Sequence, residues 1–419
     1  MTSKVRNLFL ALFCLLVFAA LGFVFYTNWV VQRPFAVILF VSSNLTPNHL
    51  AVARAYQSNS GKLLYLDRLP IRGTLRNASK DSLIPDSAAA ASALATGRKI
   101  PNGVASCSAT GEKLTTLLDA AAARGRATGI ISNGQIFNPV LAAFAAPVPD
   151  VADREAIGRQ MLENVKLDIL LGGGRQNWVS SLQGGARKDN KDLLLQVRKV
   201  GYDIVRTRKE LLVTPTWRSP RVVGVFAEGD MAYAEDFEAA ATQPSLSDMV
   251  AQAIQLLQFN GKGYFLVVDA GLVEKAAAEN EAEVMVRELL MLDQAVAAAV
   301  KYAGEDALVV VAGTNAIGGF NLSGDAQSQD QGIGLFVPLS SGKPSITWAT
   351  GKNNSPATAE SSLQNTRRRG VLQQAIAVDT PTALPVASDV FFFAKDTDRE
   401  KWGTVSDNTQ IYKILSEQF

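Results

Sequence analysis

The sequence predicts an α/β protein in which a mostly parallel central sheet is covered by helices on both faces and is preceded by a transmembrane helix. Two observations predict the sheet. Short apolar runs alternate with segments of helical periodicity along the chain. Several of these runs, such as 37–41 and 308–311, are apolar at every position, as expected for strands buried on both faces. A third observation, an eighteen-residue apolar run at 8–25, predicts the membrane span.

The N-terminal apolar run is the first element. Lys4 and Arg6 precede it, so the positive-inside rule places residues 1–7 in the cytoplasm and a span at 8–31 across the membrane, with Tyr26 and Trp29 at the far interface. The rest of the chain would then face the periplasm or the exterior, with the bacterial inner membrane as the expected location.

A cleaved signal peptide is the alternative interpretation of this run. Residues 17–19, Val-Phe-Ala, offer a small-residue cleavage pattern. The apolar stretch continues past that point, which favours an uncleaved anchor.

The remaining elements are predicted from the apolar runs and their periodicity. Core strands are expected at 37–41, 128–132, 168–171, 222–226, 264–268, 308–311 and 390–393. Helices are expected at 114–124, 155–164, 193–200, 246–258 and 281–302. Residues 321–366 are rich in Ser, Gly, Asn and Gln, which indicates an irregular insertion within a single domain at 35–419.

A short Ala-rich helix at 87–96 carries the most informative pattern. Asp86 is a good N-cap and Gly97 suits the left-handed position that ends a helix. Ser87 would therefore lie where unpaired N–H groups and the helix dipole attract an anion. A serine nucleophile that handles phosphate is one interpretation, and an ordinary capped helix is the other.

The run 86–103 resembles the nucleophile segment of the alkaline phosphatase family. The shared pattern is Asp-Ser-Ala-Ala-x-Ala-x-Ala, then Ala-Thr-Gly, a basic pair and Asn-Gly. Further segments that are similar to the family in the same order lie at 37–41, 69–73, 168–175, 226–233, 244–249 and 308–320. The resemblance covers about residues 35–419 and implies the family's three-layer sandwich, the hydrolysis of phosphoric monoesters with Ser87 as nucleophile, and a possible homodimer.

The same resemblance implies that the metal centre is incomplete. Family members hold two zinc ions and one magnesium ion with three histidines, several carboxylates and a hydroxyl, whereas this chain has one histidine, His49, at no ligand position. The positions that lose their ligand type fall on Ser43, Asn138, Val140, Ala278, Thr314, Asn315 and, approximately, Pro385. Those that keep a carboxylate are Asp269, Glu274 and Asp389. Zinc needs imidazole, thiolate or carboxylate donors, so we expect no zinc site.

Other candidate site residues follow from the family geometry. Asp86, Asp269 and Glu274 could converge on one weakly held magnesium ion, with carboxylates that bind no ion as the alternative. Arg154 lies about three residues out of register with the family's phosphate-binding arginine. It is a candidate for a bidentate anion contact, with a helix-surface salt bridge as the alternative.

These observations favour a pseudophosphatase that binds an anionic ligand or a protein partner, with no cofactor or at most one magnesium ion. One alternative is a hydrolase that uses Ser87 and a reduced metal site, and another is a structural subunit of a membrane complex. The net charge is only +2 and no basic run is interleaved with aromatic residues, so nucleic-acid binding has no support.

Overall fold

A nine-stranded sheet forms the centre of the protein in the computed structural model, which describes residues 3–25, 36–58, 63–108, 111–163, 167–218, 221–238, 240–322, 345–352 and 374–419. The strand order is β2-β14-β8-β1-β7-β3-β4-β6-β5. The bounds are β1 Ala36–Ser42, β2 Ile71–Leu75, β3 Ala127–Gln135, β4 Ile169–Gly173, β5 Tyr202–Val205, β6 Arg221–Val225, β7 Tyr264–Asp269, β8 Leu308–Gly313 and β14 Val390–Lys395. Only β14 runs against its neighbours, β2 and β8, which confirms the predicted, mostly parallel sheet.

Helices cover both faces of this sheet. The helices of the body are α2 Pro47–Ser58, α3 Ser87–Thr96, α4 Leu117–Ala123, α5 Pro139–Ala145, α6 Arg154–Glu163, α7 Leu193–Lys199, α8 Arg208–Leu212, α9 Leu246–Leu257, α10 Gly271–Ala278, α11 Ala282–Ala303 and α13 Asn408–Ser416. Along β1, Ile38 and Phe40 join a core with α2, α9, α10 and α11, while Val37 and Leu39 face a second core with α3, α4, α5 and α13. Because side chains alternate along a strand, an all-apolar strand supplies both cores. The three-layer architecture is confirmed.

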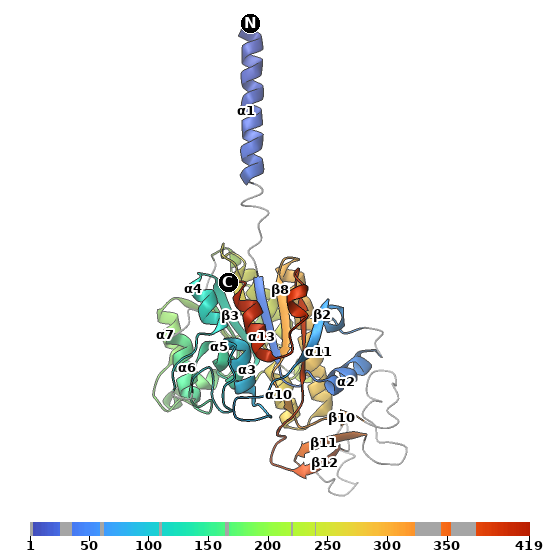
Figure 1. Cartoon of the computed structure of the whole chain (residues 1–419). Coiled ribbons are helices and arrows are strands. Elements are labelled where there is room, and N and C mark those ends of the chain that lie inside the picture. Colours follow the sequence, from blue (N-terminus) through green and yellow to red (C-terminus); the bar gives the residue numbers. More distant parts are fainter. Residues whose placement is uncertain are drawn as a thin grey trace.

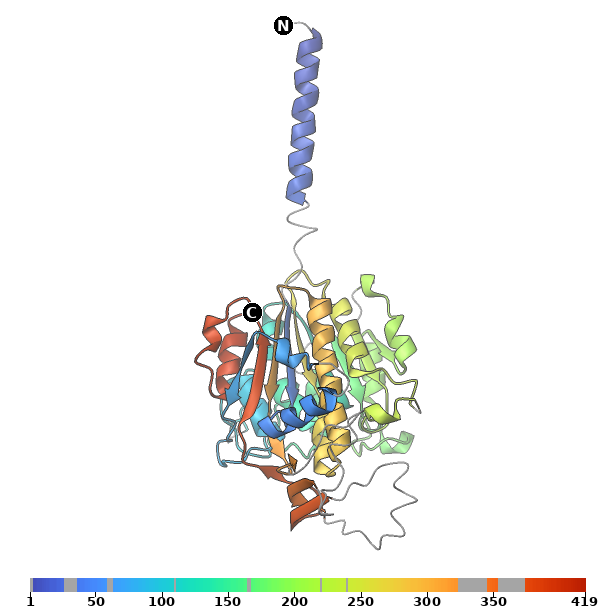
Figure 2. The same ribbon diagram turned by 90° about the vertical axis from the view of Figure 1, so that its right-hand side faces the viewer.

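The apolar N-terminal helix α1 (Ser3–Phe25) stands apart from the body (Figures 1 and 2). By length and composition it can cross a membrane, and no other helix among the described residues can; a signal sequence passes the same criteria. The predicted interfacial residues Tyr26 and Trp29, and the rest of the predicted span to residue 31, lie outside the described residues.

The sequence prediction missed several elements. β2 and β5 are the two outermost strands of the sheet, and α2, α5, α10 and α13 are helices of seven to twelve residues. The predicted helix at 114–124 begins only at Leu117, because the Thr116 side chain caps it.

The expectation of an irregular segment at 321–366 is wrong in part. Ile346–Gly351 forms β11, which pairs with β10 (Asn321–Leu322) and β12 (Gln374–Asp379) in a three-stranded sheet. Ile346 and Trp348 alternate into the core, a period-two pattern that is too short to stand out in the sequence. Residues 323–344 and 353–366 of this segment, and position 164 at the end of a predicted helix, lie outside the described residues.

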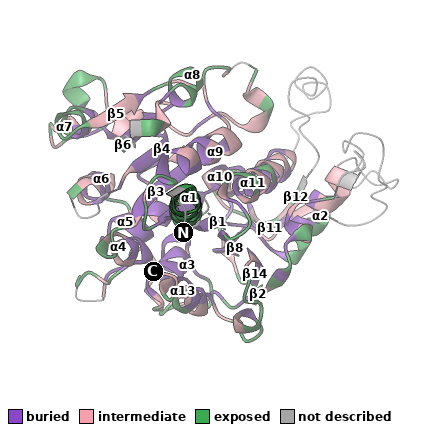
Figure 3. Cartoon of the chain, turned by 90° about the horizontal axis from the view of Figure 1, so that it is seen from above, coloured by how far each residue is buried: buried purple, intermediate pink, exposed green. Residues whose placement is uncertain are grey.

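The sheet has one end where its parallel strands begin and an opposite end where they stop, and each of these ends is called an edge below. The chain enters the sheet at Ala36, at the edge where the parallel strands begin. At the opposite edge, the strands end and α3 and α10 begin. Seen from above in Figure 3, helices lie on either side of the sheet. The site predicted from the sequence belongs to the edge where the strands end, away from the attachment of α1.

Candidate functional site

Helix α3 has the capped start that its sequence predicts. Asp86 is extended, with φ −81° and ψ 173°, and its Oδ1 accepts the N–H of Ala89 at 2.7 Å. Its Oδ2 accepts the N–H of Gly103 at 2.6 Å. The helix ends at Gly97 with φ 69°, in the left-handed region that favours glycine. Ser87, at the first helical position, is 8% exposed.

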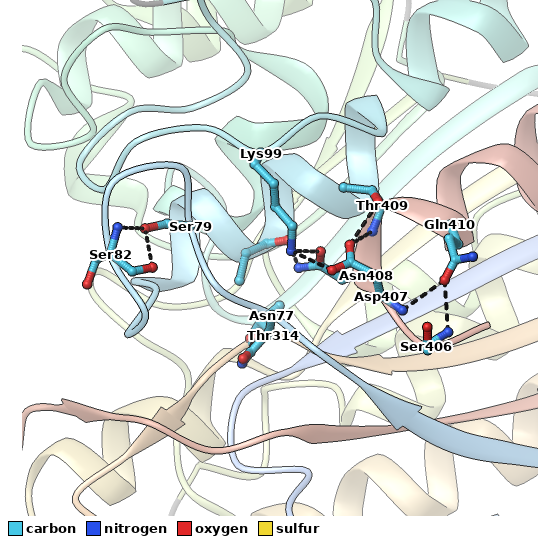
Figure 4. Close-up of polar contacts among 11 residues, drawn as sticks. Asn77, Ser79, Ser82, Lys99, Thr314, Ser406, Asp407, Asn408, Thr409 and Gln410 are labelled. Carbon is cyan, nitrogen blue, oxygen red and sulfur yellow. Dashed lines mark hydrogen bonds and ion pairs between the residues drawn. The ribbon is translucent and has the colours of Figure 1, made fainter.

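The C-terminal helix α13 packs on α3 and fixes its position (Figure 4). Lys99, just after α3, forms an ion pair with Asp407 at 3.2 Å and donates to Asn408 Oδ1 at 2.7 Å. Asn408 is fully buried and donates from Nδ2 to the carbonyl of Ala90 at 3.4 Å. The position of Ser87 therefore depends on α13, which lies more than three hundred residues later in the sequence. No sequence motif indicated this contact.

Glu274 and Asp269 bring carboxyl groups toward Ser87. Asp269 is the last residue of β7, and Glu274 lies on α10, directly after it. The Ser87 hydroxyl is near enough to Glu274 to act on the pKa of its carboxyl. Burial raises the pKa of Glu274 to about 7, and the carboxylates of Asp269 and Asp86 add to this shift, while Ser87 and Arg154 oppose it.

Asp269 is held by side chains from two other elements. It is 2% exposed, and its Oδ2 accepts the Ser132 hydroxyl at 2.8 Å and Asn138 Nδ2 at 2.7 Å. Burial raises its pKa to about 6, and the two hydrogen bonds limit the shift. Asn138, expected only as a lost metal ligand, is thus a hydrogen-bond partner of Asp269 and also the N-cap of α5.

Arg154 begins α6 and lies close to two carboxylates. It donates to the carbonyl of Phe137. Partial burial lowers its pKa, and the charges of Asp230 and Glu274 raise it. Arg154 is therefore within electrostatic range of Glu274, and its role in binding an anion stays a prediction. Asp230, which pairs with Lys275 at 3.2 Å, was not predicted, although it lies within the family-like segment 226–233.

The structure also shows which side chains lie at the positions that lack the family's metal ligands. Ser43 and Thr314 follow the ends of the adjacent strands β1 and β8, and both are buried with Asn315. Thr314 Oγ1 donates to Asn315 Oδ1 at 3.0 Å, and Asn77 Nδ2 donates to the Thr314 carbonyl at 2.8 Å (Figure 4). Pro385 belongs to β13 (Pro385–Val386), which pairs with β9 (Ala316–Ile317) beside them. The donor types at these positions do not fit zinc.

The three carboxylates expected to share a magnesium ion do not form such a site. Within the described ranges, no group of three or more His, Cys, Asp or Glu side chains is placed to hold a metal ion. Each oxygen of Asp86 already accepts a backbone N–H. Asp86 caps a helix, and its charge reaches Glu274 only at longer range.

His49 packs in the core, away from these carboxylates. It is 2% exposed, lies beside Thr46 with Nδ1 at 2.6 Å from Oγ1, and contacts the Phe320 ring. Burial lowers its pKa to about 3, so it is neutral at physiological pH.

Comparisons with known proteins agree with this arrangement. A family model described as alkaline phosphatase matches residues 36–418. Alkaline phosphatase 4 of Bacillus subtilis (strain 168) is 31% identical over 291 residues, which cover 65% of this chain and 60% of that protein. Alkaline phosphatase 3 of the same organism is 30% identical over 249 residues, covering 58% of this chain and 51% of that protein. The chain therefore spans about half to three fifths of the length of these relatives.

Solved structures share the fold. An alkaline phosphatase from Thermus thermophilus superposes with a TM-score of 0.75 at 23% identity, covering 93% of this chain and 92% of that one. A cold-active alkaline phosphatase from Shewanella sp. superposes with a TM-score of 0.73 at 23% identity, covering 92% and 100% of the two chains.

Proposed function

Because this chain belongs to the alkaline phosphatase family, we propose that it is a membrane-anchored member whose cleft binds an anionic ligand or a protein partner without efficient hydrolysis of phosphate esters. One observation carries the proposal: buried neutral residues, Ser43, Thr314 and Asn315, occupy the ends of β1 and β8 where the family has metal ligands.

The replacements form a physically consistent set. A cluster of carboxylates without its cations suffers strong like-charge repulsion, and neutral side chains remove that repulsion. Thr314 and Asn315 also hydrogen-bond to each other at 3.0 Å. The carboxyls that remain, Asp269 and Glu274, have raised pKa values that keep part of their population protonated near neutral pH. This cleft is therefore suited to hydrogen-bonded side chains more than to a divalent cation.

The energetics of phosphate transfer support weak catalysis. A serine hydroxyl becomes a good nucleophile only when a base or a metal removes its proton. A helix N-terminus stabilises an anion by about 0.3–2 kcal/mol, whereas efficient hydrolysis of a phosphate monoester requires roughly 20 kcal/mol of barrier lowering or more. The start of α3 and the nearby Arg154 can contribute to binding a phosphate group, but not to most of that barrier.

Hydrolysis of p-nitrophenyl phosphate by the purified full-length chain tests the proposal. We expect the same rate for the wild type and Ser87→Ala, with or without added zinc and magnesium. Metal analysis of the same preparation should find well under one zinc ion per chain. About two zinc ions per chain, or turnover well above the Ser87→Ala background, would overturn the proposal.

A second candidate function, a slow hydrolase, is favoured by the raised pKa of Glu274, a carboxyl on which the Ser87 hydroxyl acts. A carboxylate with a pKa near 7 is suited to act as a general base close to neutral pH. The Ser87 oxygen would bond to phosphorus while its proton passes to Glu274, and the bond from phosphorus to the ester oxygen would break, so that this oxygen leaves as an alcohol with a proton from water. A second water molecule would then attack the phosphoserine, release phosphate and restore Ser87. A rate that rises with pH around 7, and is lost in both Ser87→Ala and Glu274→Gln, would identify this activity.

A further inference from the structure

Basic residues gather over one half of the sheet end opposite the site, where β7, β3, β4, β6 and β5 begin. The described residues at the starts of β3, β5, β6 and β7 are 123–126, 198–201, 216–218 with Arg221, and 258–263, and we call them together the basic edge. They contain seven Lys or Arg residues and no Asp or Glu. Because parallel strands all begin at one edge of a sheet, these four segments lie at the same end of the body.

Contacts between these segments show that they form neighbouring parts of one surface. Asn260 Nδ2 donates to the carbonyl of Gly125 at 3.2 Å, which joins the segments before β7 and β3. Arg221 lies over the Tyr202 ring at 4.5 Å and donates to the carbonyl of Val200, which joins those before β6 and β5. The strand order β7-β3-β4-β6-β5 places the two pairs side by side, separated only by β4.

Most of the basic side chains on this edge point into solvent. The exposed ones are Arg124, Arg198, Lys199, Arg221 and Lys262. Arg126 instead donates to the carbonyl of Gln418 at 2.6 Å and lies over the ring of the C-terminal Phe419. Carboxylates also lie at this end of the body: that of the C-terminal Phe419, that of Asp168, which accepts the N–H of Thr128 at 2.8 Å, and those of Glu305 and Asp306 just before β8. Burial raises the pKa of Asp168, and the charge of Arg221 opposes this shift. The surface keeps an excess of positive charge.

Large apolar side chains are exposed among these charges. Val200 is 59% exposed, Trp217 is 79% exposed and Phe259 is 54% exposed. Trp217 lies in the short helix η5 (Thr216–Arg218) just before β6. Aromatic side chains interleaved with Lys and Arg are typical of surfaces that contact the headgroup region of a membrane.

We propose that the basic edge docks on anionic lipid headgroups of the bilayer that holds α1. The proposal rests on the membrane anchoring proposed above. The chain enters β1 at Ala36 on this same edge, and ten residues, 26–35, join it to Phe25. Ten residues span at most about 35 Å, so the anchor keeps the basic edge near the bilayer whatever path they take. Anionic headgroups attract clustered Lys and Arg within about a Debye length.

Docking in this way turns the candidate site away from the bilayer. Ser87 and Glu274 lie at the end of the sheet where the parallel strands stop, and the basic edge lies where they begin.

Fluorescent labelling of the full-length chain in lipid nanodiscs tests the docking. A cysteine that carries an environment-sensitive dye replaces either Trp217 or, as a matched control, Leu182 (Trp217→Cys and Leu182→Cys), both with Cys14→Ser. Leu182 is 83% exposed and follows the other end of β4. We expect acrylamide to quench the dye at position 217 at least twofold less in discs with 30% phosphatidylglycerol than in phosphatidylcholine discs. Quenching at position 182 should be equal in both.

Charge reversal identifies the cause. Arg124→Glu with Lys262→Glu should abolish the difference at position 217, whereas Lys80→Glu with Lys188→Glu, which changes the net charge equally at exposed sites away from the basic edge, should preserve it. Equal quenching at position 217 in both lipids, or equal effects of the two double variants, would overturn the docking. If the chain failed to co-elute with the discs at all, the anchoring would fail, and the docking with it.

Discussion

At the scale of single residues, Glu274 has the environment that most affects both stability and chemistry. It is half-buried, and its burial together with the carboxylates of Asp269 and Asp86 raises its pKa to about 7. The folded protein therefore binds a proton at this carboxyl more readily than the unfolded chain does.

This environment predicts a pH-dependent effect of Glu274→Gln on stability. The pKa of Glu274 is about 7 in the folded state, against about 4.5 for an ordinary glutamate. Between these values the folded state binds more protons than the unfolded state, so this carboxyl lowers stability as pH rises through the window. The free energy of unfolding of Glu274→Gln, relative to the wild type, should therefore increase by about 1–3 kcal/mol from pH 5 to pH 8.

Urea denaturation of the full-length chain at the two pH values measures this difference. Glu305→Gln, at an exposed position, is the control and should show no such change. A constant difference between Glu274→Gln and the wild type across the window would mean that the carboxyl ionises as it does in water.

Some site residues could be predicted from the sequence because their roles are local. Asp86, Ser87 and Gly97 follow from capping rules that involve neighbours within one helix. Asp230 and the bond from Asn138 to Asp269 could not, because they join segments more than forty residues apart. The resemblance to the family supplied Asp269, Glu274 and Arg154, although not the contacts that shift their pKa values.

At the scale of elements, α3 depends on α13 as much as on its own caps. All ten residues of α3 are buried, and Tyr412 of α13 packs directly against Gly97. The Ala-rich sequence predicts the helix, but the small side chains also permit the close approach of α5 and α13. This second role is not visible in local propensity, since alanine favours a helix whether or not it is packed.

The contact between Gly97 and Tyr412 predicts a large cost for Gly97→Ala. At φ 69°, a Cβ on residue 97 would lie 2.7 Å from Tyr412 Cδ1. Gly184 has φ 81°, and a Cβ there would meet nothing within 4 Å. We expect Gly184→Ala to lower the free energy of unfolding by about 1–2 kcal/mol through backbone strain alone, and Gly97→Ala by about 2–4 kcal/mol through strain and overpacking together.

Chemical denaturation of both variants tests this difference, and a Tyr412→Ala background separates the two causes. With the ring removed, Gly97→Ala should cost no more than Gly184→Ala. If Gly97→Ala were equally costly with and without Tyr412, the ring would not be what constrains α3.

At the scale of the whole molecule, charge is distributed unevenly between the two ends of the sheet. The basic edge carries exposed Lys and Arg residues where four parallel strands begin, and the opposite end carries Asp86, Asp269, Glu274 and Asp230 with Arg154 and Lys275 beside them. The sequence does not show the basic edge as a run, because its charges come from four separate segments. It did predict the sheet, since that depends on apolar runs which remain continuous along the chain.

The basic residues before α1 predict how the chain is oriented across the membrane. With Lys4 and Arg6 before α1, the body beyond residue 33 should lie outside the cytoplasm. Protease added to intact spheroplasts should therefore degrade the body while a cytoplasmic marker survives. Protection of the body until lysis would reverse the orientation, and release of the body without protease would indicate a cleaved signal peptide.

Restoration of the metal ligands tests the proposed loss of catalysis at the scale of the whole site. Ser43 follows β1, Thr314 and Asn315 follow β8, Ala278 ends α10 and Pro385 lies on β13, so donors must come from four separate elements. Zinc affinity depends on several donors acting together, and one new imidazole leaves the coordination incomplete. Ala278→His alone should therefore neither bind zinc nor raise the hydrolysis of p-nitrophenyl phosphate above the Ser87→Ala background.

The combination Ser43→Asp, Glu274→Asp, Ala278→His, Thr314→Asp, Asn315→His and Pro385→His should bind zinc and gain a rate that disappears when Ser87→Ala is added. A strong gain from Ala278→His alone would show that the remaining residues already form a nearly complete metal centre.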